Sequence, residues 1–217
     1  MASRNINDLY NLADYICRKE RGVFLSTSEF TSAMDWSQLE FYQSCFSVYG
    51  VNQTIHDALS NFKVRQQFTS SLDGTVLFPS DYLHLLGGAF TVTGSTVNPI
   101  RFLTQDELPQ ALTAQLRAVS LSAPIAVDSA GGFYLYPQSQ QIGFYTYMRR
   151  PATPVLAVTY SGTDGRTVTY DPNNSVQLEF TDIYLNNILS RALKVIGINM
   201  DEQGIEAFAQ SQSQQSN

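Results

Sequence analysis

The stretch from Gly131 to Pro151 most constrains what this chain can fold into. It holds two alternating, aromatic-rich runs, residues 133–136 and 142–148, joined by the polar segment 137–141. A period of two in aromatic and β-branched residues is typical of paired strands. The stretch therefore predicts an aromatic β-hairpin.

The second run divides into two faces. Tyr145 and Tyr147 share one face with Gly143, and the other face carries Ile142, Phe144, Thr146 and Met148. A tyrosine ring is apolar and its hydroxyl is polar, which suits a surface that is half solvated or packed on a partner. Guanidinium groups just beyond the run suit contacts with acidic groups. The candidate interface residues are Tyr134, Tyr145, Tyr147, Arg149 and Arg150. The alternative is that the chain's own helices cover the tyrosine face.

Helical periodicity occupies both ends of the chain. Asn5 is suited to begin a first helix, and Ser26 with Glu29 forms a capping box for a long second helix. Near the other end, Gly197 follows an apolar stripe at helical spacing, and a last helix is predicted around Ile205. Each end carries an apolar stripe that needs cover, which predicts that the two ends meet as one bundle.

Between these ends the pattern changes to strands. Asp73-Gly74 is a hairpin signal, and Gly87-Gly88 permits a bend or bulge within an apolar strand. A further hairpin is predicted around Thr163-Asp164-Gly165, between residues 155–160 and 166–170. The segment 104–107 has the form of a second capping box and predicts one short helix.

The fold class that follows is α+β, with N- and C-terminal helices forming a bundle and a central antiparallel β-rich domain, sandwich-like or barrel-like. We expect a helical segment at 1–62, the β-rich domain at 63–175, completing helices at 176–209 and a disordered or partner-bound tail at 210–217.

Composition favours a subunit that packs among others. Charged residues make up 15% of the 217 residues, against roughly 25% in ordinary soluble domains, and charges are depleted in interface cores. A plain soluble domain with neutral surface decoration is the alternative. The net charge of −6 argues against a domain that grips nucleic acid, because such domains carry basic patches.

The chain offers little of the chemistry that an active site needs. It contains two histidines, His56 and His84, which we interpret as a solvated helix residue and a core residue, and it lacks the usual nucleophile, metal and phosphate-loop motifs. Asp106 and Glu107 could be weighed as an acid–base pair, but adjacent residues do not share a helical face and both suit a helix start. We predict that the protein is not an enzyme and binds no metal or cofactor.

The compartment follows from the cysteines and from hydropathy. Cys17 and Cys45 are the only cysteines, both in apolar helical patterns, so we expect two buried, reduced thiols and synthesis in the cytoplasm. No apolar run approaches the ~20 residues of a membrane span, and the N-terminus shows no signal-peptide pattern.

Several short motifs, in this order, resemble those of a known family. These are the strand entry Phe78-Pro79-Ser80-Asp81-Tyr82, the helix start Thr104-Gln105-Asp106-Glu107, the strand end Tyr147-Met148-Arg149-Arg150-Pro151, Tyr170-Asp171-Pro172 and the helix from Ile188 to Ile198. Together they resemble the head–tail connector or ring proteins of podovirus-like tailed phages, closest to the crAss-like phages of Bacteroides. The similarity spans about Asn5 to Phe208. The chain departs from the motifs of this family at two places. Phe78 stands where the family has a leucine, and the segment 178–182 stands where the family has an acidic segment that contains tryptophan.

This resemblance implies a structural virion protein. It implies a homo-oligomeric ring of twelve copies that is stacked on the portal protein, contacts adjacent ring or tail proteins and lines the channel through which DNA passes without sequence-specific binding. The virion would be assembled in the host cytoplasm, without a membrane partner. The alternative from a different class is a glycan- or receptor-binding β module of a phage tail, with Tyr134, Tyr145 and Tyr147 as the stacking platform.

Overall fold

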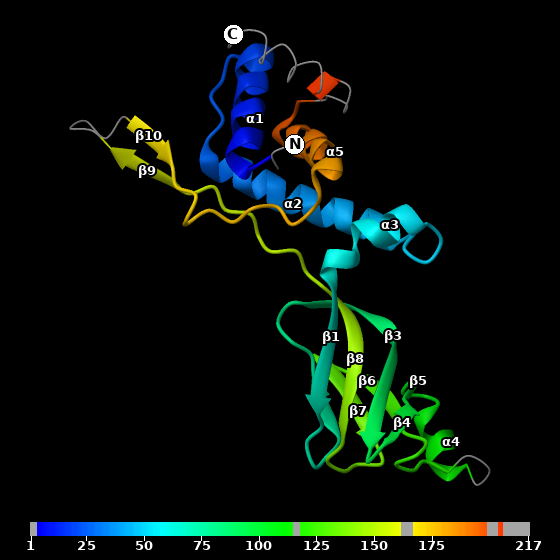
Figure 1. The fold of residues 1–217 in the computed structure, drawn as a ribbon. Helices are drawn as coiled ribbons and strands as arrows, with labels where there is room; N and C mark the ends of the chain where they lie inside the picture. Colours follow the sequence, from blue (N-terminus) through cyan, green and yellow to red (C-terminus); the bar gives the residue numbers. More distant parts are fainter. Residues whose placement is uncertain (1–3, 115–117, 162–166, 199–203, 206–217) are drawn as a thin grey trace. The chain divides into compact units, whose positions relative to one another are not determined.

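The computed structural model describes residues 4–114, 118–161, 167–198 and 204–205 (Figure 1). It is a mixed α+β structure that divides into two compact units. Residues 1–61 and 151–217 form the first, called the helical unit here, and residues 62–150 form the second, the β unit. The predicted C-terminal tail and most of the predicted last helix lie outside the described residues.

Local sequence signals set the ends of the helices in the helical unit. Asn5 begins α1 (Ile6–Arg21) with a capping box that it shares with Asp8, and Ser26 begins α2 (Thr27–Phe46) with a capping box that it shares with Glu29. Both N-caps are as predicted. The described part of this unit also holds α3 (Gln53–Ala58) and α5 (Asp182–Ile196), and the 3-10 turn η1 (Ser60–Phe62) crosses the boundary to the β unit.

The two ends of the chain contact each other within this unit. Phe41 of α2 packs edge-on against Phe180, with ring centroids 5.3 Å apart. Arg21, at the end of α1, donates hydrogen bonds to the carbonyls of Ile196 and Gly197 at 2.8 and 2.7 Å. Gly197 ends α5 with a φ of 92°, a left-handed conformation that glycine adopts without strain. The predicted helix stop at this glycine is confirmed.

The helical unit also contains a β-hairpin, formed by β9 (Val158–Ser161) and β10 (Thr167–Tyr170). The β-rich domain was expected to extend to residue 175, but the β unit ends at Arg150. The contacts of Ala152 give a physical reason. Its N–H donates to Glu179 and its carbonyl accepts from Gln38, both at 2.8 Å, so this segment is held by the helical unit.

In its described residues the β unit holds two four-stranded sheets and a short helix, α4 (Leu108–Thr113). Sheet A has the order β1 (Lys63–Thr69), β8 (Ile142–Arg149), β3 (Tyr82–Thr93), β4 (Thr96–Pro99). Sheet B has the order β2 (Thr75–Leu77), β7 (Gly132–Tyr136), β6 (Ile125–Ser129), β5 (Arg101–Leu103). All pairs are antiparallel except β5 with β6, which is parallel and departs from the predicted antiparallel pattern.

One apolar cluster joins the two sheets. Sheet A contributes Phe68, Ala89, Tyr145 and Tyr147, and sheet B contributes Val76, Ala126, Phe133 and Leu135. Ring contacts dominate this core, because aromatic side chains bury a large area and prefer edge-on or offset contacts. Phe133 packs edge-on against Phe68 at 5.6 Å.

The predicted aromatic hairpin is wrong, because β7 and β8 belong to different sheets. β7 pairs with β2 and β6, and β8 pairs with β1 and β3. The turn at Asp73-Gly74 likewise connects β1 in one sheet to β2 in the other, and Gly74 bonds to Leu135 of β7. The predicted irregularity at Gly87-Gly88 is confirmed by a register shift between Leu86 and Phe90.

Candidate interaction surfaces

Tyr145 and Tyr147 lie in the core of the β unit, with 1% and 3% of their surface exposed. Tyr145 packs against Phe68, Phe78 and Phe133, with centroid distances between 5.7 and 6.1 Å. Desolvation raises the pKa of both phenols to about 12. The expectation that these two rings face a partner is therefore wrong for this chain, and the alternative is wrong in its detail, because sheet B rather than the chain's helices covers them.

The other candidate interface residues are distributed over both sheets. Tyr134 is exposed on β7 of sheet B. Arg150 is exposed just beyond β8 of sheet A, and Arg149 is half-buried with its guanidinium 5.4 Å from the centre of the Phe62 ring. The structure thus does not gather the five residues into one surface. Tyr134 is exposed on sheet B, whereas Tyr145 and Tyr147 are buried, so these three rings do not form one exposed platform on which a glycan could stack.

Two of the motifs behind the family resemblance meet at one end of the β unit. The Tyr147 hydroxyl donates to the Asp81 carboxylate at 3.0 Å, and the Arg150 N–H donates to the Asp81 carbonyl at 2.7 Å. Phe78 stacks on Tyr82 with a centroid distance of 3.8 Å and an interplanar angle of 2°. These contacts fix the start of β3 against the end of β8.

The side of sheet A opposite the core presents an apolar surface, which we call the outer face. Strand register places its members, because residues directly opposite one another in antiparallel strands point to the same side. Phe144 pairs with Phe90, Ile142 pairs with Val92, and Val92 pairs with Val97. Ile142 is 47% exposed and Val97 58% exposed. The outer face comprises Arg65, Phe90, Val92, Val97, Ile142 and Phe144.

Arg65 completes the outer face from β1. Its guanidinium carbon lies 5.2 Å from the centre of the Phe90 ring and 4.8 Å from that of Phe144, within the range of cation–π attraction. The two rings lie 5.5 Å apart. Rigid aromatic and branched side chains beside an arginine match the composition of protein interface cores. The sequence predicts that Ile142 and Phe144 share one face of β8, but it does not predict that this face points away from the core.

A second apolar surface lies between α2 and α5 in the helical unit. Trp36, the single tryptophan, is 67% exposed and lines an open groove of about 610 Å³. Ala33 of α2 and Val195 and Ile196 of α5 line it as well. We call it the Trp36 groove. Large exposed apolar surfaces of this kind mark sites where proteins meet partners.

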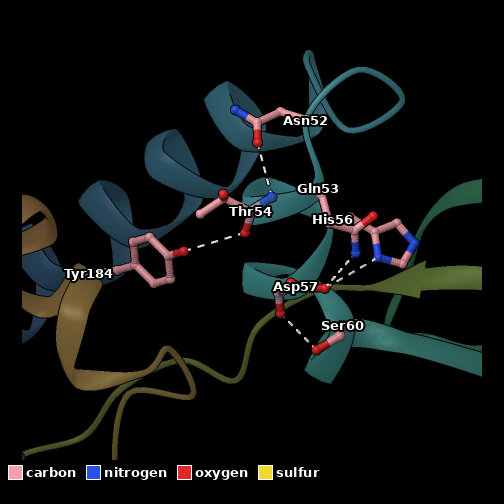
Figure 2. A network of polar contacts seen from close by, with 7 residues as sticks. All are labelled: Asn52, Gln53, Thr54, His56, Asp57, Ser60 and Tyr184. Atoms are coloured by element: carbon pink, nitrogen blue, oxygen red, sulfur yellow. Dashed lines mark hydrogen bonds and ion pairs between the residues drawn. The ribbon is translucent and has the colours of Figure 1, made fainter.

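The polar residues around α3 support the local structure (Figure 2). Asn52 accepts a hydrogen bond from the Thr54 N–H at 2.9 Å, and the Tyr184 hydroxyl donates to the Thr54 carbonyl at 3.4 Å. His56 lies beside Asp57, with 3.9 Å between Nδ1 and Oδ1, and stacks on Tyr49 at 4.8 Å. These contacts give His56 a structural role at α3.

The remaining titratable candidates also have structural contacts. The Glu107 carboxylate accepts a hydrogen bond from the Thr104 N–H at 3.0 Å, but the predicted capping box does not begin the helix, because α4 starts at Leu108 and its N-cap, Glu107, makes no side-chain cap hydrogen bond. His84 is half-buried on β3, where desolvation lowers its pKa. Within the described ranges, no three His, Cys, Asp or Glu side chains gather as metal ligands would. None of the helices in those ranges is long and apolar enough to cross a membrane.

No protein-family model matches the chain, and no curated protein sequence matches it either.

Proposed function

We propose that this chain is a structural virion protein, a subunit of a head-to-tail connector ring that is stacked on the portal and lines the genome-ejection channel. The observation that carries the proposal is the outer face of sheet A, an apolar and aromatic surface on a chain with few charges. The proposed assembly has twelve copies, is built in the host cytoplasm, and contacts the portal and adjacent ring or tail proteins.

A closed ring needs two different surfaces on each subunit, because each copy contacts one neighbour on either side. The outer face and the Trp36 groove are two such surfaces on two different units of the chain. Burying apolar side chains contributes about 25 cal/mol per Å² of apolar area. Exposed Ile142, Val97 and Trp36 therefore favour association.

The use of the acidic groups supports a structural rather than a catalytic role. Asp81 accepts from Tyr147, Glu179 accepts from the Ala152 N–H, and Glu40 pairs with Arg191 at 2.9 Å. The Asp171 carboxylate holds the turn 171–174 by accepting from two backbone N–H groups. Each of these carboxylates has a task in holding the fold, so we propose no enzymatic activity, no metal and no cofactor.

The net charge of −6 supports a channel wall. A negative surface repels the phosphates of DNA, so the genome passes without binding. In the same proposal the chain's helices form a bundle, the two sheets of the β unit form a sandwich, and the polar segment 210–217 contacts a neighbouring ring.

The test replaces apolar side chains on the outer face by polar, uncharged ones. In the variant Ile142→Gln with Val97→Gln, we expect an almost unchanged melting temperature and a loss of ring formation in sedimentation and electron microscopy. The matched control, Leu72→Gln with Leu112→Gln, changes two exposed leucines elsewhere in the β unit and should assemble normally. Normal ring assembly by the outer-face variant would show that the outer face is not an interface and would contradict the proposal.

A further inference from the structure

The hairpin β9–β10 forms a two-stranded sheet of its own in the helical unit (Figure 1). Its two strands pair only with each other among the described residues, so each has an outer edge of backbone N–H and C=O groups. An isolated two-stranded hairpin is at best marginally stable in water. Such an edge is a template for another strand.

The base of the hairpin is firmly held. The Asp171 N–H donates to the Ala157 carbonyl at 3.0 Å, and the Ala157 N–H donates to the Ser175 hydroxyl at 2.9 Å. Gln177 donates to the Tyr170 hydroxyl at 2.8 Å and accepts from the Ile6 N–H at 2.7 Å, which ties β10 to the start of α1. The strands therefore project from a fixed base.

The edge strands of the β unit carry features that block pairing with other chains. β1 contains Lys63 and Arg65, β4 ends in Pro99, β5 is three residues long and contains Arg101, and β2 is three residues long. Charges, prolines and short length are the usual protections of a sheet edge. The strands β9 and β10, with sequences VTYS and TVTY, contain neither a charge nor a proline.

The sequences of the two strands indicate which further strand would fit the open edges of the hairpin. Both strands contain the triplet Val-Thr-Tyr, at 158–160 and 168–170, and the two triplets pair with each other in antiparallel register. A second copy brings the same two strands to the open edges without any charge repulsion. The occupant that matches best is therefore another copy of this chain.

We propose that β10 of one copy pairs with β9 of the next, so that the hairpins of successive subunits join into one continuous sheet. This inference rests on the proposed ring and names one seam by which its subunits are joined. The contact is heterologous, as ring closure requires. Backbone hydrogen bonds supply the affinity, and Val168, which is 56% exposed, lies on the strand that the neighbour would cover.

The test places charges on both strands of the seam. Thr159→Lys with Thr169→Lys puts like charges on the same face of the two strands that meet at the seam, because these positions pair in the hairpin register, and like charges on facing strands destabilise pairing. We expect self-association of the purified chain, with or without its portal, to weaken about tenfold or more. Thr159→Lys with Thr169→Glu should restore it, because the opposite charges then lie on the same face. The control Leu72→Lys with Leu112→Lys adds the same two charges to exposed positions of the β unit away from the outer face and should associate like the unmodified chain.

Amide hydrogen exchange on the unmodified chain gives a second readout that needs no variant. We expect slow exchange of the amides in 158–161 and 167–170 in the assembled protein and fast exchange in the dilute chain. Unchanged association of the Lys/Lys variant, or rings in which these amides exchange fast, would overturn the seam and leave the proposed function standing. No association of the unmodified chain, even with its portal, would overturn both.

Discussion

Tyr147 donates a hydrogen bond from its phenol to the carboxylate of Asp81, across 3.0 Å and 66 positions of sequence. The bond joins the end of β8 to the segment that precedes β3. Tyr147 is almost fully buried, so its hydroxyl needs this acceptor. Two sequence motifs that looked like separate markers of a family are thus parts of one structural contact.

Alkaline pH should destabilise the β unit through this tyrosine and its neighbour. Desolvation, together with the hydrogen bond to Asp81, raises the pKa of Tyr147 to about 12, and desolvation raises the pKa of Tyr145 to about 12. An unfolded tyrosine titrates near 10. The folded state therefore holds these protons more tightly, and the resulting stability is complete below pH 10 and lost as the pH rises from 10 through 12. Phenolate absorbance and near-ultraviolet circular dichroism should change together in this window. A native fold that persists above pH 12 would contradict this.

The burial of Tyr145 predicts a large effect of truncation on folding. Tyr145→Ser removes a ring from the aromatic core, and changes of this kind cost about 3 to 5 kcal/mol. The comparison is Tyr134→Ser on exposed β7, which should change the free energy of unfolding by about 0.5 kcal/mol or less. Denaturant unfolding of both variants measures the difference. Equal, small effects would place Tyr145 outside the core.

Gly143 is predicted to tolerate no side chain. A Cβ at this position would collide with the Phe90 carbonyl and with the Phe68 ring. Overpacking of this kind costs about 1 to 3 kcal/mol, so Gly143→Ala should lower the melting temperature. Gly87→Ala, in open space on β3, is the matched control and should have little effect. A normal melting temperature for Gly143→Ala would show that β3 and β1 approach β8 less closely.

Both cysteines should be protected from alkylation in the folded protein. Cys17 and Cys45 are buried and free, and desolvation raises the pKa of both thiols. The reactive form is the thiolate, so iodoacetamide should label them slowly in the native chain and rapidly in denaturant. Mass spectrometry after a short pulse reads both states. Rapid native labelling of either residue would contradict its place in the helical unit.

The features that the sequence predicts well are local ones. The caps at Asn5 and Ser26 and the stop at Gly197 depend on residues within one helical turn, so the printed order of residues contains the whole signal. The bulge at Gly87-Gly88 and the β9–β10 hairpin are local as well.

The features that the sequence does not predict depend on distant partners. An alternating strand has two faces, and in β8 the tyrosine face is buried while the Ile142 face is outside, a choice made by which sheet packs on it. Adjacent runs also need not pair, since β7 and β8 find their partners in β2 and β3. The place of Ala152 in the helical unit depends on hydrogen bonds to Gln38 and Glu179, which the local pattern does not indicate.

The most direct test of the structural role is electron microscopy of the purified chain mixed with its portal protein. The account predicts class averages of a ring with a central channel seated on the portal, and loss of that ring in the Ile142→Gln with Val97→Gln variant. A chain that stays a monomer beside bare portals would contradict it.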